Sequence, residues 1–224
     1  MTSIGTIEIQ DLFVGGVNAV GLYFGAVEVW SKDTPQPTSL NTKVKYTAAS
    51  GLPDWEGDIV GELSSVSIPN ISKAEVVVVG TDVTSIGSTA FRNNTSLYSI
   101  DIGDNVTVIK NQAFYGCSHL GKLSLGNSVA QIQSYAFRSC TDLTNVEFPA
   151  SVNTIYQAAF YGCGRLSIAD FRNHTQVPTL YNANAFDNVS DDFKIIVPDS
   201  LYSSWIVATN WSSLASKIVK ASEA

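Results

Sequence analysis

The chain has few charged residues, and most of those it has are acidic. Only 15% of its 224 residues are charged, and 20 acidic residues against 13 Lys and Arg give a formal net charge of -7. Nucleic acids and anionic membranes bind proteins through clustered cations, so this balance argues against both as partners. The 45% of hydrophobic residues predicts a folded chain whose surface is mostly neutral and polar.

Long apolar runs are also missing. No window reaches the roughly 18 uninterrupted apolar residues that a membrane-spanning helix requires. Residues 1–6 contain no basic segment, apolar core or cleavage motif of a secretory signal. We therefore expect neither membrane insertion nor export by a standard signal.

Cysteine and histidine are too scarce for the common catalytic and zinc motifs. The two histidines, His119 and His174, lie in no nucleophile, zinc or phosphate motif, and both are expected at the surface or in turns. The three cysteines allow at most one intramolecular disulfide, whereas a zinc site needs four well-placed ligands. We predict no catalytic residue, no metal ion and no cofactor, and we do not expect an enzyme.

An internal repeat dominates the middle of the chain. Ala-Phe recurs with a strict period of 23 residues in four units, and a fifth unit is stretched by three residues. Apolar residues keep fixed positions in the four strict units: Val83, Val106, Val129, Val152; Ile86, Ile109, Ile132, Ile155; Leu97, Leu120, Leu143, Leu166; Ile102, Leu125, Phe148, Phe171. A coil of about 23 residues cannot enclose a core alone, so these positions must stack on those of adjoining coils. We predict an α/β solenoid over residues 83–197.

Each unit contains two recognisable segments. The run Leu-x-x-apolar-x-apolar alternates like a short strand, so stacked units should form a parallel sheet. The Ala-Phe stretch fits a short helix or a helical turn on the opposite side of the coil, where Phe fills the core and Ala allows close approach.

The cysteines share one position of this repeat, at Cys117, Cys140 and Cys163, and Asn94 holds that position in the first unit. Thiols one coil apart would lie about 5 Å from each other, which is compatible with a disulfide or a soft-metal site. An interior repeat position without a neighbouring histidine instead favours buried, reduced cysteines that pack as small hydrophobic groups.

The repeat pattern V-x-x-I-x-x-x-A-F-x-x-C-x-x-L-x-x-L-x-L resembles that of a known family. It is similar to the BspA-like family (leucine-rich repeat type 5) of bacterial surface and phage-borne proteins, closely over residues 83–174 and loosely over 43–197. The resemblance implies a leucine-rich-repeat stack that binds a ligand or a host surface. Members of such a family share an architecture more than they share one ligand.

Outward side chains of the predicted sheet form the candidate binding surface. They are Ser99, Asp101, Lys122, Ser124, Asn145, Glu147, Ile168 and Asp170, with Tyr98 beside them. Small hydroxyls, an amide and carboxylates suit hydrogen bonding to sugars or to a polar protein surface. The same mixture is equally typical of a solvated face that binds nothing.

Residues 1–32 differ from the repeat in character. Alternating apolar runs divided by glycines predict a small β-meander, followed over residues 33–42 by a Pro-containing linker. The segment resembles an N-terminal module of structural proteins of tailed phages that infect gut Bacteroidales. The residues that carry this resemblance and the implied role of an anchor are Leu12, Val14, Leu22, Tyr23, Val29 and Trp30.

Two atypical segments flank the repeats. Residues 43–82 contain strand-like stretches at 44–47 and 74–79 with an irregular part around 53–55, and we interpret them as a capping coil for the N-terminal end of the core. Residues 198–224 predict a helical C-terminal cap of two short helices, in which Trp205 and Trp211 cover the other end.

These observations favour a non-enzymatic structural or accessory protein of a phage virion, a head or tail decoration or fibre. Its expected partners are other virion proteins, through the N-terminal module, and a host-surface glycan or protein. A marginal β-meander is also a natural place for copies of the chain to form a homo-oligomer. The alternative is a leucine-rich-repeat adhesin of the bacterial cell surface.

Overall fold

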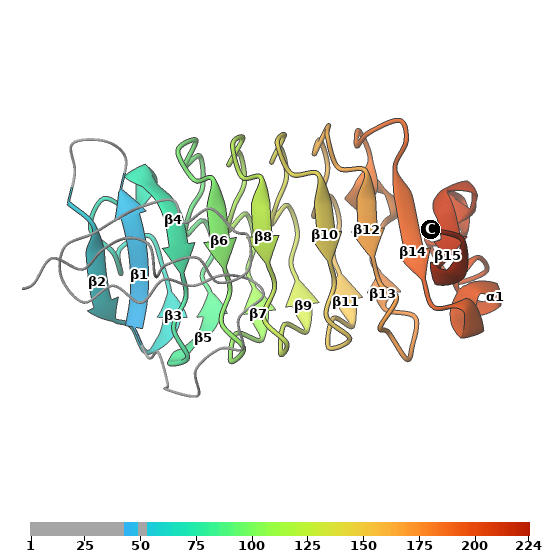
Figure 1. Ribbon diagram of the computed structural model, residues 1–224, viewed down its shortest axis with the longest axis horizontal. Coiled ribbons are helices and arrows are strands. Elements are labelled where there is room, and N and C mark those ends of the chain that lie inside the picture. Colours follow the sequence, from blue (N-terminus) through green and yellow to red (C-terminus); the bar gives the residue numbers. More distant parts are fainter. Residues whose placement is uncertain (1–42, 49–52) are drawn as a thin grey trace, which may run out of the picture. The chain divides into compact units, whose positions relative to one another are not determined.

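Stacked coils follow one another in sequence order in this computed structural model, which describes residues 43–48 and 53–224. Figure 1 shows them running from β1 and β2 at one end to α1 at the other. The expected meander over residues 1–32 and the linker over residues 33–42 lie outside the described residues. The described residues belong to one compact unit, residues 41–224.

The predicted parallel strands are present on one side of each coil. They are β4 (Ala74–Val78), β6 (Ser99–Asp101), β8 (Lys122–Ser124), β10 (Asn145–Glu147), β12 (Ile168–Asp170) and β14 (Lys194–Val197). Equivalent residues of neighbouring units pair, as Val77 with Ile100 and Ile100 with Leu123, so the repeat length itself sets the register. The pairing is interrupted once, because β8 and β10 belong to separate sheets.

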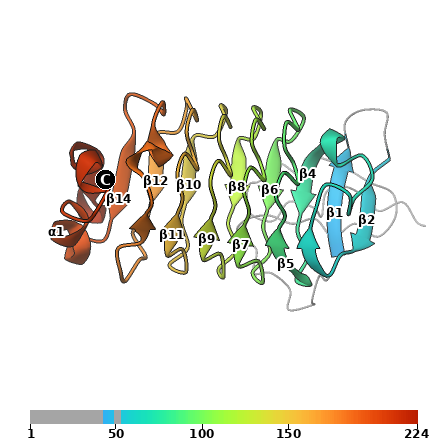
Figure 2. The ribbon, with the colours of Figure 1, turned by 180° about the vertical axis from the view of Figure 1, so that it is seen from behind.

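A second parallel sheet runs along the V-x-x-I segments, where the sequence pattern indicated no strand. Its members are β3 (Gly61–Leu63), β5 (Val83–Ile86), β7 (Val108–Ile109), β9 (Gln131–Ile132), β11 (Thr154–Ile155) and β13 (Thr179–Leu180). Figure 2 shows β5 to β11 side by side. Most of these strands are only two residues long, which is too short for alternation to reveal.

The Ala-Phe stretch is not helical in the strict units, so the predicted helix there is wrong. Alternate N–H groups bond to the next coil instead: Phe114 N donates to Ala136 O at 2.7 Å, and Gly116 N donates to Arg138 O at 2.8 Å. Gln112 and Gly116 take left-handed φ values of 57° and 73°, which turn the chain between these bonds. Hydrogen bonds between coils therefore stabilise a third side of the solenoid, in addition to the two sides that form sheets. Only the fifth unit forms a 3-10 helix here, η3 (Ala183–Phe186).

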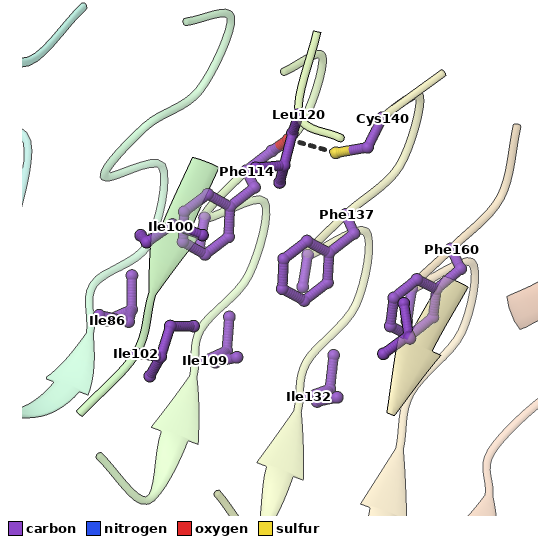
Figure 3. Packing of buried hydrophobic residues seen from close by; sticks show 14 of the residues in the cluster. Ile86, Ile100, Ile102, Ile109, Phe114, Leu120, Ile132, Phe137, Cys140 and Phe160 are labelled. Carbon is purple, nitrogen blue, oxygen red and sulfur yellow. Dashed lines mark hydrogen bonds between the residues drawn. The ribbon is translucent and has the colours of Figure 1, made fainter. Parts of the chain in front are cut away.

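A ladder of phenylalanines fills the core. Successive ring centroids of Phe91, Phe114, Phe137 and Phe160 lie 5.0, 5.0 and 5.2 Å apart, and the planes differ by at most 10°. Figure 3 shows three of these rings in line above Ile109 and Ile132. The spacing matches that of neighbouring strands, and each aromatic pair adds about 0.5–1.5 kcal/mol beyond its area burial.

At the N-terminal end, the region expected to form one capping coil contains two structures. Residues 60–82 form a coil in the same 23-residue frame, because Leu63 pairs with Ile86 and Val77 with Ile100. Before it, β1 (Lys43–Ala48) and β2 (Trp55–Asp58) form an antiparallel pair that extends the sheet beyond β4. The stretch expected to be irregular around residues 53–55 thus leads into a strand.

The C-terminal cap has much less helix than its sequence predicts. It contains η4 (Asp199–Leu201), one turn of α1 (Tyr202–Trp205), η5 (Ser212–Lys217), β15 (Ile218–Lys220) and η6 (Ala221–Glu223). Ile218 lies in β15 and pairs in parallel with Ile195 of β14. The second predicted helix is present as the 3-10 helix η5, which ends at Lys217, directly before the parallel pairing to the last coil begins.

Side chains of the cap also close the second sheet. Asn210 Nδ2 donates to the carbonyls of Leu180 and Tyr181 at 2.7 and 3.1 Å, and Trp211 Nε1 donates to Pro178 O at 2.8 Å. Pro178 O and Leu180 O correspond to carbonyls that bond to the next coil elsewhere in the stack, such as Asn153 O and Ile155 O. Trp211 and Trp205 are 1% and 0% exposed, as the predicted covering role requires.

Candidate functional site

The outward side chains of β6, β8, β10 and β12 form two rows, which we call the strand face. Ser99 lies beside Lys122 and Asp101 beside Ser124 in one half. Asn145 lies beside Ile168 and Glu147 beside Asp170 in the other. The intervening Ile100, Val146 and Ala169 are buried, so all eight predicted residues face away from the core. The structure thus brings them together on one side, in two groups of four.

Asp170 is committed to an ion pair within the protein. Its carboxylate accepts from Arg172 Nε at 2.8 Å, and Arg172 Nη2 lies 2.7 Å from the same oxygen. The Asp170 side chain is 13% exposed and that of Arg172 49%, so the guanidinium is the accessible member of the pair. Asp170 correspondingly raises the pKa of Arg172. Arg172 therefore joins the strand face, although it follows β12 and the strand motif did not indicate it.

Tyr98 lies where the sequence placed it, at the margin of the strand face. It is 49% exposed, and Lys122 Nζ lies 5.4 Å from the centroid of its ring. An exposed contact of this kind is worth about 0.5–1 kcal/mol. It gives the lysine a preferred position without neutralising its charge.

The interruption between β8 and β10 opens the middle of the strand face. Leu123 and Leu125 are only partly buried, whereas Ile100 and Val146, at the position equivalent to Leu123, are each 1% exposed. Apolar surface therefore appears at this seam between two polar groups. A ligand that crosses the seam would meet both kinds of surface.

The cysteine ladder is buried, as predicted. Each thiol donates to the carbonyl of the phenylalanine 26 residues earlier, at 3.0, 3.2 and 3.1 Å for Cys117, Cys140 and Cys163. Figure 3 shows this bond for Cys140. Burial raises the pKa of Cys117 and Cys163 to about 12 and that of Cys140 well above its ordinary value. All three are free cysteines that remain protonated thiols near neutral pH, which suits packing and not nucleophilic chemistry.

The histidines differ from each other. His119 is exposed, as expected, and its Nδ1 contacts Thr95 O. His174 closes a turn, because its N–H donates to Phe171 O at 2.9 Å, but it does not lie at the surface. It is 5% exposed, its Nε2 lies 3.1 Å from Val152 O, and its Nδ1 has no partner among the described residues. Burial lowers the pKa of His174, which favours the neutral ring. The cause is long-range, because the C-terminal cap brings Trp205 against it, with ring centroids 6.2 Å apart.

Other kinds of site are not prominent in the described part of the chain. It contains no group of three or more His, Cys, Asp and Glu arranged to hold a metal ion. None of its helices combines the length and the apolar character needed to cross a membrane. A hollow of about 450 Å³ lies between residues 177–181 and 208–211. The Asn210 amide and the Trp211 N–H in its lining already donate to carbonyls.

A further row of polar side chains was missed by the sequence reasoning. Arg92, Tyr115, Arg138 and Tyr161 each follow an Ala-Phe pair directly, so they recur at the 23-residue period. We call them the tyrosine-arginine row. The 23-residue period is a sequence signal for this row, whereas strand alternation and the apolar positions are not.

Comparison with known proteins agrees with this geometry. A family model described as "BspA type Leucine rich repeat region" matches residues 63–203 in six copies, which begin within the coil over residues 60–82. Comparison with curated protein sequences finds no match.

Several solved bacterial structures are similar. A leucine-rich repeat protein from Eubacterium ventriosum is 20% identical with a TM-score of 0.53, over 70% of this chain and 44% of that one. The Treponema pallidum protein TpLRR is 25% identical with a TM-score of 0.49, over 55% and 58%. A leucine-rich repeat protein from Bacteroides ovatus is 24% identical with a TM-score of 0.49, over 65% and 42%. This chain spans about half the length of these structures. The repeat match covers more than half of the chain, so the protein belongs to the family of BspA type leucine-rich repeat proteins.

Proposed function

We propose that the protein acts by binding and not by catalysis, and that the strand face recognises a polar ligand on a host surface, a glycan or a protein. The observation that carries the proposal is the register of the two outward rows. It holds Ser99 beside Lys122 on the paired strands β6 and β8, and Glu147 beside Asp170 on the paired strands β10 and β12. Membership of a repeat family whose stacked coils present extended binding surfaces supports it.

The chemistry of the strand face suits such a ligand. Lys122 is oriented by Tyr98 and Arg172 by Asp170, so both cations lose little conformational freedom on binding. Asn145 is exposed and offers both a donor and an acceptor. Side chains that are already ordered bind a hydroxyl-rich or amide-rich surface at a lower entropic cost than free ones.

A glycan array together with intact host cells tests this function. The full chain is compared with a double variant, Lys122→Ser and Asn145→Ser, which removes one cation and one amide from the strand face. Asn153→Ser is the matched control, because Asn153 is an exposed asparagine beside the second sheet. We expect binding by the wild type and the control that the double variant loses. Equal binding by all three would place the ligand elsewhere, and no binding to arrays or cells would refute the function.

We further propose that the protein is displayed on the head or tail of a phage virion, and that residues 1–32 bind other virion proteins. The resemblance of that segment to a phage structural module supports this location. Peptide mass spectrometry of purified virions and of the host's surface-protein fraction is the test. Peptides of this chain in virions support the proposal. Peptides confined to the bacterial fraction would favour the alternative, a cell-surface adhesin.

The same segment is proposed to join copies of the chain. Light scattering of the full chain and of a chain that starts at Asn41 tests this, because residues 41–224 form a compact unit of their own. A lower oligomeric state of the shorter chain is expected. The same state for both would remove residues 1–32 from assembly.

A further inference from the structure

The tyrosine-arginine row forms a continuous set of cation-π contacts along the Ala-Phe side of the coils. Arg92 lies over the ring of Tyr115 at 4.9 Å. Arg138 lies 4.6 Å from the centroid of Tyr161 and 5.8 Å from that of Tyr115. Tyr135, from the same coil as Arg138, approaches its guanidinium from a third direction at 5.6 Å. Three rings therefore fix the position of one cation.

Among the described residues, Arg138 differs from the other three arginines in lacking a polar partner. Arg165 pairs with Asp142, Arg172 pairs with Asp170, and Arg92 donates to Gln112. In the described part of the chain no acceptor or carboxylate bonds the Arg138 guanidinium, and its Nε is shielded from solvent without a partner. A cation that is fixed in position and has no counterion is available to bind an anionic group. A guanidinium binds a carboxylate through two parallel hydrogen bonds.

The surroundings of Arg138 narrow the class of ligand. Hydrogen bonds between coils place the turns that contain Gln112 and Gln157 on either side of the turn that contains Arg138 and Ser139. Gln157 Nε2 donates to Tyr135 Oη at 3.0 Å. These groups are uncharged hydrogen-bonding partners. The large hydrophobic side chains exposed in the described residues are all elsewhere, at Val60, Val66, Val76, Tyr98, Tyr181 and Val207. The buried centre of a protein-protein interface is more apolar than this, although Tyr and Arg are enriched in such interfaces too.

We propose that the cluster of Arg138 with Tyr115, Tyr135 and Tyr161 binds a sugar that carries a carboxylate. The guanidinium receives the carboxylate, and the tyrosine hydroxyls and neighbouring amides bond the sugar hydroxyls. The net charge of -7 disfavours long polyanions, which need many cations, but it leaves one oriented cation able to bind one carboxylate. This site lies on another side of the coils from the strand face and does not depend on that face binding anything.

Titration calorimetry of the full chain with three sugars tests the proposal. Sialyllactose and a galacturonate disaccharide are two sources of the carboxylate, and lactose is the neutral counterpart of the first. We expect at least one acidic sugar to bind and lactose not to bind. Arg138→Gln should weaken the acidic sugar roughly ten- to a hundredfold, as expected for the loss of a charge-assisted hydrogen-bond pair. Arg165→Gln removes an exposed cation elsewhere and should change nothing.

Three results would overturn the proposal: no binding of either acidic sugar, equal binding of lactose, or unchanged affinity of Arg138→Gln. Arg138→Lys keeps the charge but loses the planar fork, so we expect it to bind more weakly than the wild type, and wild-type affinity would refute the paired hydrogen bonds. If Arg138→Gln fails to fold, the comparison of both acidic sugars with lactose on the wild type, together with Arg138→Lys, still decides. The strand-face double variant should bind acidic sugars normally, which separates this proposal from the function above.

Discussion

Asn94 occupies the repeat position that cysteine holds in the next three units, and we predict that Asn94→Cys destabilises the protein. Asn94 is 0% exposed and makes four hydrogen bonds. Its Nδ2 donates to Ile71 O and Ala74 O, both at 2.9 Å, and its Oδ1 accepts from the N–H groups of Ser96 and Leu97 at 2.9 and 3.1 Å. Ile71 is the first residue of the 3-10 helix η2 (Ile71–Lys73), and Ala74 directly follows it. This helix stands 23 residues before Asn94–Ser96, where later coils have the segment that begins with the cysteine. The asparagine thus compensates for an atypical preceding coil.

The magnitude follows from the groups left without partners. Ile71 O keeps the bond that it already accepts from Ala74 N, and a thiol donates one weak hydrogen bond, as in the other units, so Asn94→Cys leaves up to two of the other three backbone groups unpaired. Each buried unpaired group costs about 1–3 kcal/mol. Allowing for partial repair at Ser96, whose bond is only partly buried, we expect a loss of about 3 kcal/mol in the free energy of unfolding. For a unit of this size that lowers Tm by roughly 6–12 °C.

Thermal denaturation followed by circular dichroism measures the effect. Cys140→Ala is the control, because it removes one thiol and one weak bond at the equivalent position, and we expect it to cost about 1 kcal/mol. A substitution towards the repeat's own consensus commonly stabilises a protein. An unchanged or higher Tm for Asn94→Cys would therefore refute the reasoning from hydrogen bonds.

Three further predictions rest on the buried core. Burial lowers the pKa of His174, so below about pH 6.5 the unfolded chain binds a proton that the folded chain does not. The free energy of unfolding should therefore fall as the pH drops below this value. Melting curves at several pH values should show the fall for the wild type and for His119→Gln, and much less of it for His174→Phe. Phe137→Ala should cost about 3–5 kcal/mol in denaturant unfolding because the ring stacks on both sides, whereas Phe137→Leu should cost clearly less, and similar losses would contradict the ladder's role. The three cysteines should resist a thiol reagent in the native protein and react quickly once urea unfolds it, and fast native labelling would contradict their raised pKa and burial.

The strand register was predictable from the sequence because units of equal length pair residues that are one repeat length apart. Val77, Ile100 and Leu123 are 23 residues apart, so a stack of equal coils must pair them. The same counting placed the predicted face residues, such as Lys122 and Asn145, on the outward side. Counting could not predict the ion pair of Asp170 with Arg172, because strand alternation indicates which way a side chain points but not which charged group it contacts.

The repeat, its inward positions and its solenoid stacking were determined by the sequence, because a 23-residue unit has only its neighbours on which to bury Phe and Leu. The tertiary structure alone decided how each end closes and which polar side chains meet. Backbone groups at the ends of the sheets bond to segments outside the repeats: to β1 at one end, and to Asn210 and β15 at the other. His174 was buried by a segment some 30 residues away, and Arg138 met three tyrosines from three coils. Such contacts depend on distances across the stack, which no local pattern encodes.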